Sequence, residues 1–446
     1  MNLKQILAKA KNTDNLVIGS GALDECGSLL NSYWDENKVI IVADTNTWKA
    51  AGEKLSVSLK SGGFEILPPV IFTVPPFLLA DYENVRSITS EIDKHPDSVL
   101  VAVGSGTIND LVKRAAFETG KTYMCVGTAA SMDGYCSSGA ALSSEGRKQT
   151  MECPAPRVII ADTDILETAP PESSAAGYGD LASKLTAGAD WIIADFTGDD
   201  PIDSSVWEIV QPRLEGWLSS PEKLAAAEPE ALSRIFEGLN FSGLAMQVLG
   251  RSRAASGAEH LFSHIWEMSG HLGADGNPVS HGFQVSIGIL CVTALMEEVF
   301  SKGAEEINIE KAVDIYPSWP KRAAEIEELM GALPSWEEYL AICRKKHLEK
   351  DQLLRKLQRI KGGWEVLSSR VWSRLPSYRE MKNSLRTAGC PISPEDINLD
   401  RQTAIKTYAK AQCMRNRYTI LDLAYEIGIL NDCAMGIQSN SEYLYR

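Results

Sequence analysis

Short runs of apolar, often β-branched residues recur between residues 15 and 165, and stretches with helical periodicity separate them. The runs lack the polar–apolar alternation of a strand with one solvated face, so each suits a parallel sheet covered on both faces by helices. Strands that alternate with helices in this way predict an α/β domain. We expect strands at residues 16–19, 38–44, 98–104, 122–127 and 157–162.

After residue 166 the strand-like runs end and helical periodicity dominates. A pair of prolines and several small residues interrupt the chain at residues 165–180, where we place the junction. A chain of 446 residues also exceeds the size at which one hydrophobic core usually stops growing. We therefore expect an α/β domain at residues 1–166 and an all-α domain at residues 167–446.

The charge balance argues against several classes of partner. With 44 Lys and Arg against 59 Asp and Glu, the formal net charge of −15 opposes any broad attraction to nucleic acid or anionic lipid. The basic stretch at residues 344–361 carries Leu353, Leu357 and Ile360 at helical spacing, so an amphipathic helix with a solvated face explains it. A phosphorylated small substrate would need a local basic pocket.

Targeting signals and cysteine usage favour a cytoplasmic protein. Residues 1–15 lack the apolar run and the small-residue cleavage site of a secretory signal. No run of about 18 uninterrupted apolar residues predicts a membrane span. The nine cysteines are scattered and form no C-x-x-C pair, so neither a disulfide framework nor a thiolate zinc site is indicated.

Glycines between an expected strand and an expected helix suit a phosphate group. Gly104 and Gly106 precede apolar residues at period 3.6, and Thr107 and Asp110 stand in capping-box spacing. A helix N-terminus behind glycines offers unpaired N–H groups and a positive dipole end, which suits a pyrophosphate. The full G-x-G-x-x-G fingerprint is absent, so a tight turn without a ligand is the alternative.

Two further strand ends are candidates to line the same dinucleotide. Asp44 ends the second expected strand, where its carboxylate would accept hydrogen bonds from an adenosine ribose. In the usual fingerprint the acidic residue follows the glycines, whereas Asp44 precedes them, so separate strand ends would have to converge. The segment 127–138 adds small and hydroxylated residues beside Asp133 after another expected strand.

Four of the six histidines, namely His260, His264, His271 and His281, lie close together in the sequence. The first two are four residues apart and share one face of a helix. Two imidazoles completed by a carboxylate suit zinc, iron or nickel and leave an open coordination position. Glu259 precedes the first histidine, so the H-E-x-x-H order of zinc peptidases is not met. Packed core histidines are the alternative, and we expect His271 to be no ligand.

Asp180 is the candidate carboxylate for this metal. It follows a glycine-rich segment at an expected helix start, and a helix N-cap would by itself explain it. Lys184, one turn later, would face the same side and serve either Asp180 or an anionic substrate.

Together these motifs resemble the sn-glycerol-1-phosphate dehydrogenases, a branch of the iron-containing alcohol dehydrogenase and dehydroquinate synthase-like superfamily. The resemblance implies a Rossmann-like dinucleotide-binding α/β domain followed by an all-α domain that binds metal and substrate. The resembling segments span almost the whole chain in order: GSGTINDLVKRAA, GTAASMDGYCSSGAAL, RVIIADTDIL, GYGDLASKLTAGADW, SGAEHLFSHIWEM, SHGFQVSIG and RNRYTILDLAYEIGIL.

The resemblance also implies roles for individual residues. The dinucleotide would be contacted by Asp44, Gly104, Gly106, Thr107, Ile108, Asn109, Asp110, Thr128, Ala129, Ala130, Ser131 and Ser137. The divalent metal would be held by Asp180, His260 and His281, and the substrate would meet Asp133, Asp180 and His264, with Lys184 added from its position. Two features depart from the family pattern, namely the long spacing between His264 and His281 and the tryptophan-rich helical region at 305–400.

The implied reaction is the reversible reduction of dihydroxyacetone phosphate to sn-glycerol 1-phosphate by NADH or NADPH. The metal, which is zinc, nickel or iron, would act as a Lewis acid toward the substrate oxygens. His264 and Asp133 are the catalytic candidates, because an imidazole can orient the substrate or relay a proton near neutral pH. Alternatives are a dehydrogenase for glycerol or another polyol, a dehydroquinate synthase, and a non-catalytic nucleotide-binding module. A homo-oligomer is expected.

Overall fold

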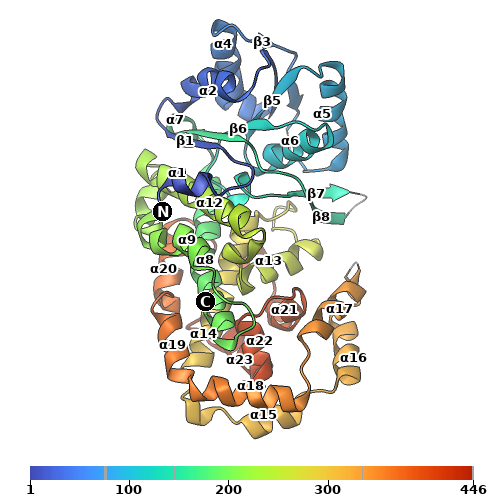
Figure 1. Ribbon diagram of the computed structural model, residues 1–446. Coiled ribbons are helices and arrows are strands. Elements are labelled where there is room, and N and C mark those ends of the chain that lie inside the picture. Colours follow the sequence, from blue (N-terminus) through green and yellow to red (C-terminus); the bar gives the residue numbers. More distant parts are fainter. Residues whose placement is uncertain (75–77, 145–146, 334, 444–446) are drawn as a thin grey trace. The chain divides into compact units, whose positions relative to one another are not determined.

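The computed structural model describes residues 1–74, 78–144, 147–333 and 335–443. The chain forms two compact units (Figure 1). The first contains Met1–Leu181 and Ser205–Ser252, and the second contains Ala182–Ser204 and Arg253–Arg446. The first unit therefore includes helical residues that lie beyond the predicted junction at residue 166. The assignment of separate binding roles to residues 1–166 and 167–446 stays a prediction.

A parallel sheet forms the centre of the first unit. Its strands run in the order β1-β9-β6-β5-β2-β3, and β4 also pairs with β2. All five predicted strands are confirmed to within a residue at each end, whereas β3, β4 and the antiparallel hairpin β7-β8 were not predicted. The strands are β1 (Asn15–Gly19), β2 (Lys38–Asp44), β3 (Glu65–Ile66), β4 (Val70–Phe72), β5 (Ser98–Gly104), β6 (Tyr123–Gly127), β7 (Ala140–Ser144), β8 (Arg147–Met151) and β9 (Val158–Asp162).

Helices cover both faces of this sheet. These and the other helices of the first unit are α1 (Leu3–Leu7), α2 (Cys26–Tyr33), α3 (Thr45–Thr47), α4 (Glu53–Ser61), α5 (Tyr82–Lys94), α6 (Gly106–Glu118), α7 (Thr163–Leu166), α9 (Ser204–Val210), α10 (Leu214–Leu218), α11 (Pro221–Ala225) and α12 (Pro229–Leu249). Val39 and Ile41 of β2 share a core with Leu30 of α2 and Leu55 of α4. Ile40, between them, points to the other face and is equally buried. The continuous apolar runs in the sequence thus reflect strands that are buried on both sides.

The order of the strands reverses between β2 and β5. From β2 the chain continues to β3 and β4 on one side, whereas from β5 it continues to β6 on the other side. Open α/β sheets bind ligands at the carboxyl ends of strands where the order reverses in this way. Asp44, Gly104 and Gly127 are the last residues of β2, β5 and β6, which are adjacent strands. The structure thus brings together the three strand ends that a shared dinucleotide would require.

Among its described residues the second unit contains helices and no strand beyond one isolated bridge between Leu272 and Pro278, as predicted for the back half of the chain. The long helix α8 (Pro171–Thr197) contributes its C-terminal part to this unit. The tryptophan-rich region at 305–400 forms helices α15 to α20, and Trp364 is among its buried residues. The other helices are α13 (Ala258–Met268), α14 (His281–Phe300), α15 (Ile309–Ile315), α16 (Trp319–Met330), α17 (Trp336–Lys346), α18 (Lys350–Gly362), α19 (Trp364–Trp372), α20 (Tyr378–Thr387), α21 (Arg401–Cys413), α22 (Ile420–Glu426) and α23 (Leu430–Ser439).

Helix α14 is unusually apolar because it lies in the core. Among the described residues it is the one helix long and apolar enough to cross a membrane, by length and composition alone. Its apolar window is 83% buried within the structure, which is typical of a core helix. At Gly288 an added Cβ would lie 2.4 Å from the carbonyl oxygen of Glu259, so α14 packs directly against the backbone of α13.

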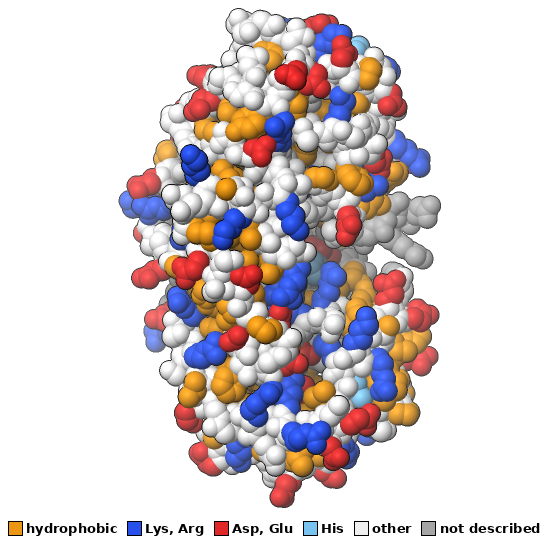
Figure 2. Space-filling model, in the orientation of Figure 1, with side chains coloured by type: hydrophobic (Ala, Val, Ile, Leu, Met, Phe, Trp, Pro, Cys, Tyr) orange, Lys and Arg blue, Asp and Glu red, His pale blue; other side chains and the backbone are white. Residues whose placement is uncertain are grey.

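The surface and the cysteines agree with the sequence-based expectations. Lys and Arg side chains are interspersed with Asp and Glu over the face shown in Figure 2. All nine cysteines are buried, and none of them forms a disulfide in the structure.

Candidate active site

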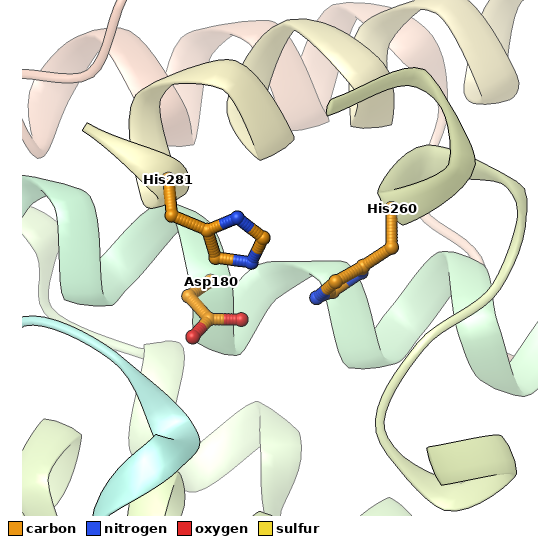
Figure 3. A group of neighbouring side chains, drawn as sticks. All are labelled: Asp180, His260 and His281. Carbon is orange, nitrogen blue, oxygen red and sulfur yellow. The ribbon is translucent and has the colours of Figure 1, made fainter. Parts of the chain in front are cut away.

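The structure brings the three predicted metal ligands together. Asp180 lies on α8, His260 on α13, and His281 is the first residue of α14. Each offers one ligand atom, and these atoms lie within 4.8 Å of one another. Figure 3 shows the three side chains pointing toward a common centre. Two imidazoles and a carboxylate fit a divalent transition metal and leave coordination positions open.

Asp180 lies in the interior of α8, nine residues after the helix begins at Pro171. The interpretation of Asp180 as a helix N-cap is therefore wrong. Its side chain is buried, and its Oδ2 accepts a hydrogen bond from the backbone N–H of Asp133 at 2.8 Å. A buried carboxylate is costly without such donors, so this contact helps to hold the group in place.

Both histidines of the trio face a glutamate through Nδ1. The Nδ1 atom of His260 lies 2.9 Å from Oε1 of Glu259, and that of His281 lies 3.1 Å from Oε1 of Glu267. Burial acts to raise the pKa of Glu259, but the hydrogen bond and the charge of His260 hold it below its ordinary value. Neither glutamate was predicted to belong to the site from the sequence. The available signal in the sequence was their position, because Glu259 is next to His260 and Glu267 follows His264 by one helical turn.

His264 lies beside the trio without belonging to it. Its ring centroid is 6.3 Å from that of His260 and 6.0 Å from that of His281. Its Nδ1 is 3.6 Å from Oε2 of Glu267, and desolvation lowers the pKa of His264 well below its ordinary range. His271 is occupied elsewhere, because its Nε2 lies 2.6 Å from the carbonyl oxygen of Ile397. This placement agrees with the expectation that His271 is no ligand.

The other two predicted substrate residues are both held by hydroxyl groups. Lys184 is buried, and its Nζ donates to Oγ of Ser183 at 3.2 Å. Asp133 accepts a hydrogen bond at Oδ2 from Oγ of Ser242 at 3.0 Å. The substrate-binding roles of Lys184 and Asp133 stay predictions.

The start of α6 differs from the predicted capping box. Ser105 is the N-cap residue and makes no side-chain capping bond. The predicted pairing of Thr107 with Asp110 is wrong, because the Asp110 carboxylate accepts from Nζ of Lys113 at 3.1 Å and from the backbone N–H of Ala141 at 3.0 Å. The first-turn N–H groups of an α-helix have no partner within the helix, and here no side-chain cap takes their place.

Close packing explains the glycines in this segment. An added Cβ at Gly104 would lie 2.6 Å from Cβ of Ile108, a side chain that is buried beneath the turn. At Gly106 an added Cβ would lie 2.9 Å from Cε of Met132. The side chain of Asn109 is also used internally, since it accepts from the Tyr123 hydroxyl at 2.8 Å. Any contact that Ile108, Asn109 or Asp110 makes with a dinucleotide would therefore come from the backbone.

The loop after β6 is fixed by bonds to its own backbone and to neighbouring elements. The N–H of Thr128 donates to the carbonyl of Gly104 at 3.1 Å, and the Tyr135 hydroxyl donates to the carbonyl of Ala129 at 2.8 Å. Ala130 is in close contact with α8, because a Cβ at Gly177 would lie 1.8 Å from its carbonyl oxygen. The hydroxyl of Ser137 donates to the carbonyl of Gly134 at 3.3 Å, and Ser131 is half-buried.

Asp44 caps the helix that follows its own strand. Its Oδ1 accepts from the N–H groups of Asn46 and Thr47 at 2.8 and 2.9 Å. A carboxylate has a second oxygen with further acceptor capacity, so the capping role is compatible with a ribose contact. That contact stays a prediction.

Comparison with known proteins places the chain in a family. A family model described as iron-containing alcohol dehydrogenase matches residues 17–170. The glycerol-1-phosphate dehydrogenase (NAD(P)+) of Halalkalibacterium halodurans is 34% identical over 296 residues, which cover 66% of this chain and 73% of that relative. The chain belongs to the glycerol-1-phosphate dehydrogenase family. The enzyme of the same name from Geobacillus stearothermophilus is 29% identical over 418 residues, covering 93% of each chain.

Solved structures show the same fold. Glycerol dehydrogenase from Schizosaccharomyces pombe aligns with a TM-score of 0.59 at 15% identity, covering 98% of this chain and 94% of that one. Maleylacetate reductase from Agrobacterium tumefaciens aligns with a TM-score of 0.60 at 12% identity, covering 96% and 95%. The predicted combination of a Rossmann-like α/β portion and an all-α portion is thereby confirmed.

Proposed function

We propose that this chain reversibly reduces dihydroxyacetone phosphate to sn-glycerol 1-phosphate, with NADH or NADPH and one divalent metal. The observation that carries the proposal is the convergence of Asp180, His260 and His281 within 4.8 Å, in a member of this dehydrogenase family. A peptidase with the H-E-x-x-H arrangement would present different side chains.

The residues around the trio would bind and orient the substrate. When bound, the cation supplies Lewis acidity and the dinucleotide supplies the hydride. His264 would hydrogen-bond a substrate oxygen, because its ring centroid lies 6.3 Å from that of His260 and 6.0 Å from that of His281, which leaves it beside the proposed metal position. Asp133 would meet the substrate from the loop whose N–H already fixes Asp180.

The carboxyl ends of the sheet strands would bind the dinucleotide. We propose that its pyrophosphate meets the first-turn N–H groups of α6, at Gly106, Thr107 and Ile108. Asp44 at the adjacent strand end would take the adenosine ribose, which favours NADH over NADPH. In this proposal residues 1–166 bind the dinucleotide and also contribute Asp133 to the substrate, and residues 167–446 bind the metal and the rest of the substrate.

We also propose that the enzyme is cytoplasmic. The absence of disulfides among the nine cysteines supports a reducing cytoplasm, where thiols are kept reduced.

The test combines metal analysis with a choice of substrates. The purified protein is analysed for zinc, nickel and iron, and NADH and NADPH oxidation is followed with dihydroxyacetone phosphate and with unphosphorylated dihydroxyacetone. We expect about one metal per chain and a clear preference for the phosphorylated ketone. A stereospecific sn-glycerol-3-phosphate dehydrogenase should fail to oxidise the product. Preference for dihydroxyacetone would favour a polyol dehydrogenase, and no oxidation in metal-supplemented buffer would favour a non-catalytic module.

A further inference from the structure

Each histidine of the trio directs one ring nitrogen toward a carboxylate and leaves the other for the centre. Glu259 faces Nδ1 of His260 at 2.9 Å, and Glu267 faces Nδ1 of His281 at 3.1 Å. An ionised carboxylate only accepts hydrogen bonds, so Nδ1 must carry the proton in both rings. Each Nε2 is then left with its lone pair, the atom that a metal binds.

We propose that Glu259 and Glu267 are positioning residues that fix both histidines with Nε2 toward the metal. This inference rests on the proposed metal site of Asp180, His260 and His281. The ligand atoms are then Nε2 of His260 and Nε2 of His281, and the two glutamates set the orientation of these rings. Carboxylates that accept from the second nitrogen of a ligand histidine typically raise metal affinity by about 10- to 100-fold.

Glu259 is built into the core in a way that suits such a role. Its side chain is buried, Oε1 also accepts from the N–H of Gly257 at 2.6 Å, and Oε2 accepts from Oγ1 of Thr186 at 2.9 Å. The close approach of Gly288 to the Glu259 backbone fixes the main chain as well. Both oxygens are therefore held in place, and Oε1 in turn holds the imidazole of His260 through Nδ1.

Glu267 has a different arrangement, because two histidines share it. Oε1 lies 3.1 Å from Nδ1 of His281, while Oε2 lies 3.6 Å from Nδ1 of His264. Glu267 thus connects a metal ligand to the histidine that we assign to the substrate. Loss of Glu259 should affect metal binding above all, whereas loss of Glu267 should also affect the steps that involve substrate.

A matched control distinguishes this role from the general cost of altering a buried carboxylate. Asp190 of α8 is also fully buried in the same unit. It accepts from the backbone N–H groups of Ala258 and Ile420, both at 2.7 Å. Asp190→Asn therefore changes a buried carboxylate without removing an acceptor from His260 or His281.

The experiment measures zinc affinity by chelator competition on metal-free protein. Cobalt absorption serves as a spectroscopic readout of ligand geometry, and circular dichroism reports folding. We expect Glu259→Met to weaken zinc binding by about 10- to 100-fold. Glu259→Gln keeps an acceptor oxygen and should lose less, while Asp190→Asn should bind zinc as the wild type does. Glu267→Gln should lose a smaller factor and change kcat or KM for the ketone at saturating metal.

The possible outcomes distinguish a failure of the positioning role from a failure of the proposed metal site. Wild-type zinc affinity in Glu259→Met, or an equal loss in Asp190→Asn, would overturn the positioning role and leave the proposed function standing. A wild-type protein that binds neither zinc nor cobalt would overturn the proposed metal site itself. If Glu259→Met does not fold, Glu259→Gln is compared with Asp190→Asn for zinc affinity and cobalt absorption, and equal values in these two variants would overturn the positioning role.

Discussion

His260 and His264 share one face of α13, yet only His260 belongs to the ligand trio. We predict that His260→Ala loses bound metal and activity together, because the cation loses one of its three protein ligands. His264→Ala should keep the metal and lose turnover, because its ring lies beside the trio. Metal content by mass spectrometry and kcat for the ketone test this.

The control for this pair is His271→Ala. His271 bonds the carbonyl of Ile397 and lies outside the ligand group, so its removal should leave metal content and kcat near wild type. Equal metal loss in the His260 and His264 variants would contradict the division of roles.

At the residue scale the sequence identified three side chains that the structure groups together, but it predicted their local settings poorly. Asp180, His260 and His281 were predicted from residue type and spacing, helped by the family resemblance. Asp180 was misplaced at a helix start because glycines precede it, although α8 continues through them. The partner of Asp110 was also missed, since the backbone of Ala141 reaches it only through tertiary folding.

Helices α13 and α14 carry His260 and His281, the two histidines of the proposed metal site, and Gly288 sets how closely the helices pack. An added Cβ there would lie 2.4 Å from the carbonyl oxygen of Glu259, a backbone atom that moves only with its helix. We predict that Gly288→Ala separates the two helices, weakens zinc binding at least tenfold and lowers stability by about 1–3 kcal/mol. Gly436→Ala in α23 is the matched control, because its Cβ would meet nothing within 4 Å. Equal zinc affinity in the two variants would contradict this account.

A buried glutamate couples α18 to α22 and makes stability depend on pH. Burial raises the pKa of Glu426 to about 7, although Lys356 at 3.0 Å and the Tyr418 hydroxyl at 2.7 Å oppose the shift. Between about pH 4.3 and 7 the folded state keeps this proton while the unfolded chain releases it. The free energy of unfolding therefore falls as pH rises through this range, by up to roughly 3 kcal/mol in total.

Glu426→Gln should remove this part of the pH dependence, because an amide does not titrate here. We predict nearly equal stability of the two proteins near pH 4.5 and an advantage of the variant that grows toward pH 7. Urea unfolding of both proteins across this range measures the difference. Parallel stability profiles would contradict the assignment to Glu426.

Four of the five strands that the sequence predicted, β2, β5, β6 and β9, are buried on both faces, whereas β1 at the edge of the sheet is only partly buried. Such strands form continuous apolar runs, and β2 and β5 match their predicted bounds. β3 spans two residues and β4 three, too short to form a recognisable pattern. The hairpin of β7 and β8 was missed because small and polar residues make up its two strands, so they form no apolar run.

At the scale of the whole molecule the order of elements was predictable and their grouping was not. Alternating strands and helices gave the α/β portion from local patterns alone. The first compact unit, however, also includes residues 205–252. They follow a segment, Ala182–Ser204, that belongs to the second unit. Helical periodicity shows that a segment is amphipathic, but it does not show which hydrophobic core the apolar face of the helix packs into. For the same reason, the sequence did not show which core the helices of the tryptophan-rich region at 305–400 belong to.

The net charge of −15 gives a last prediction for the whole molecule. The phosphorylated ketone carries about two negative charges near pH 7, so the long-range field of the protein repels it. Figure 2 shows charges of both signs interspersed on the visible face. The Debye length falls from about 30 Å at 0.01 M salt to about 8 Å at 0.15 M, which screens this repulsion. We predict that kcat/KM for the phosphorylated ketone rises severalfold over that range, while the value for neutral dihydroxyacetone stays level. Steady-state rates at saturating NADH measure both, and a fall with added salt would show that a local positive potential at the substrate site outweighs the net charge.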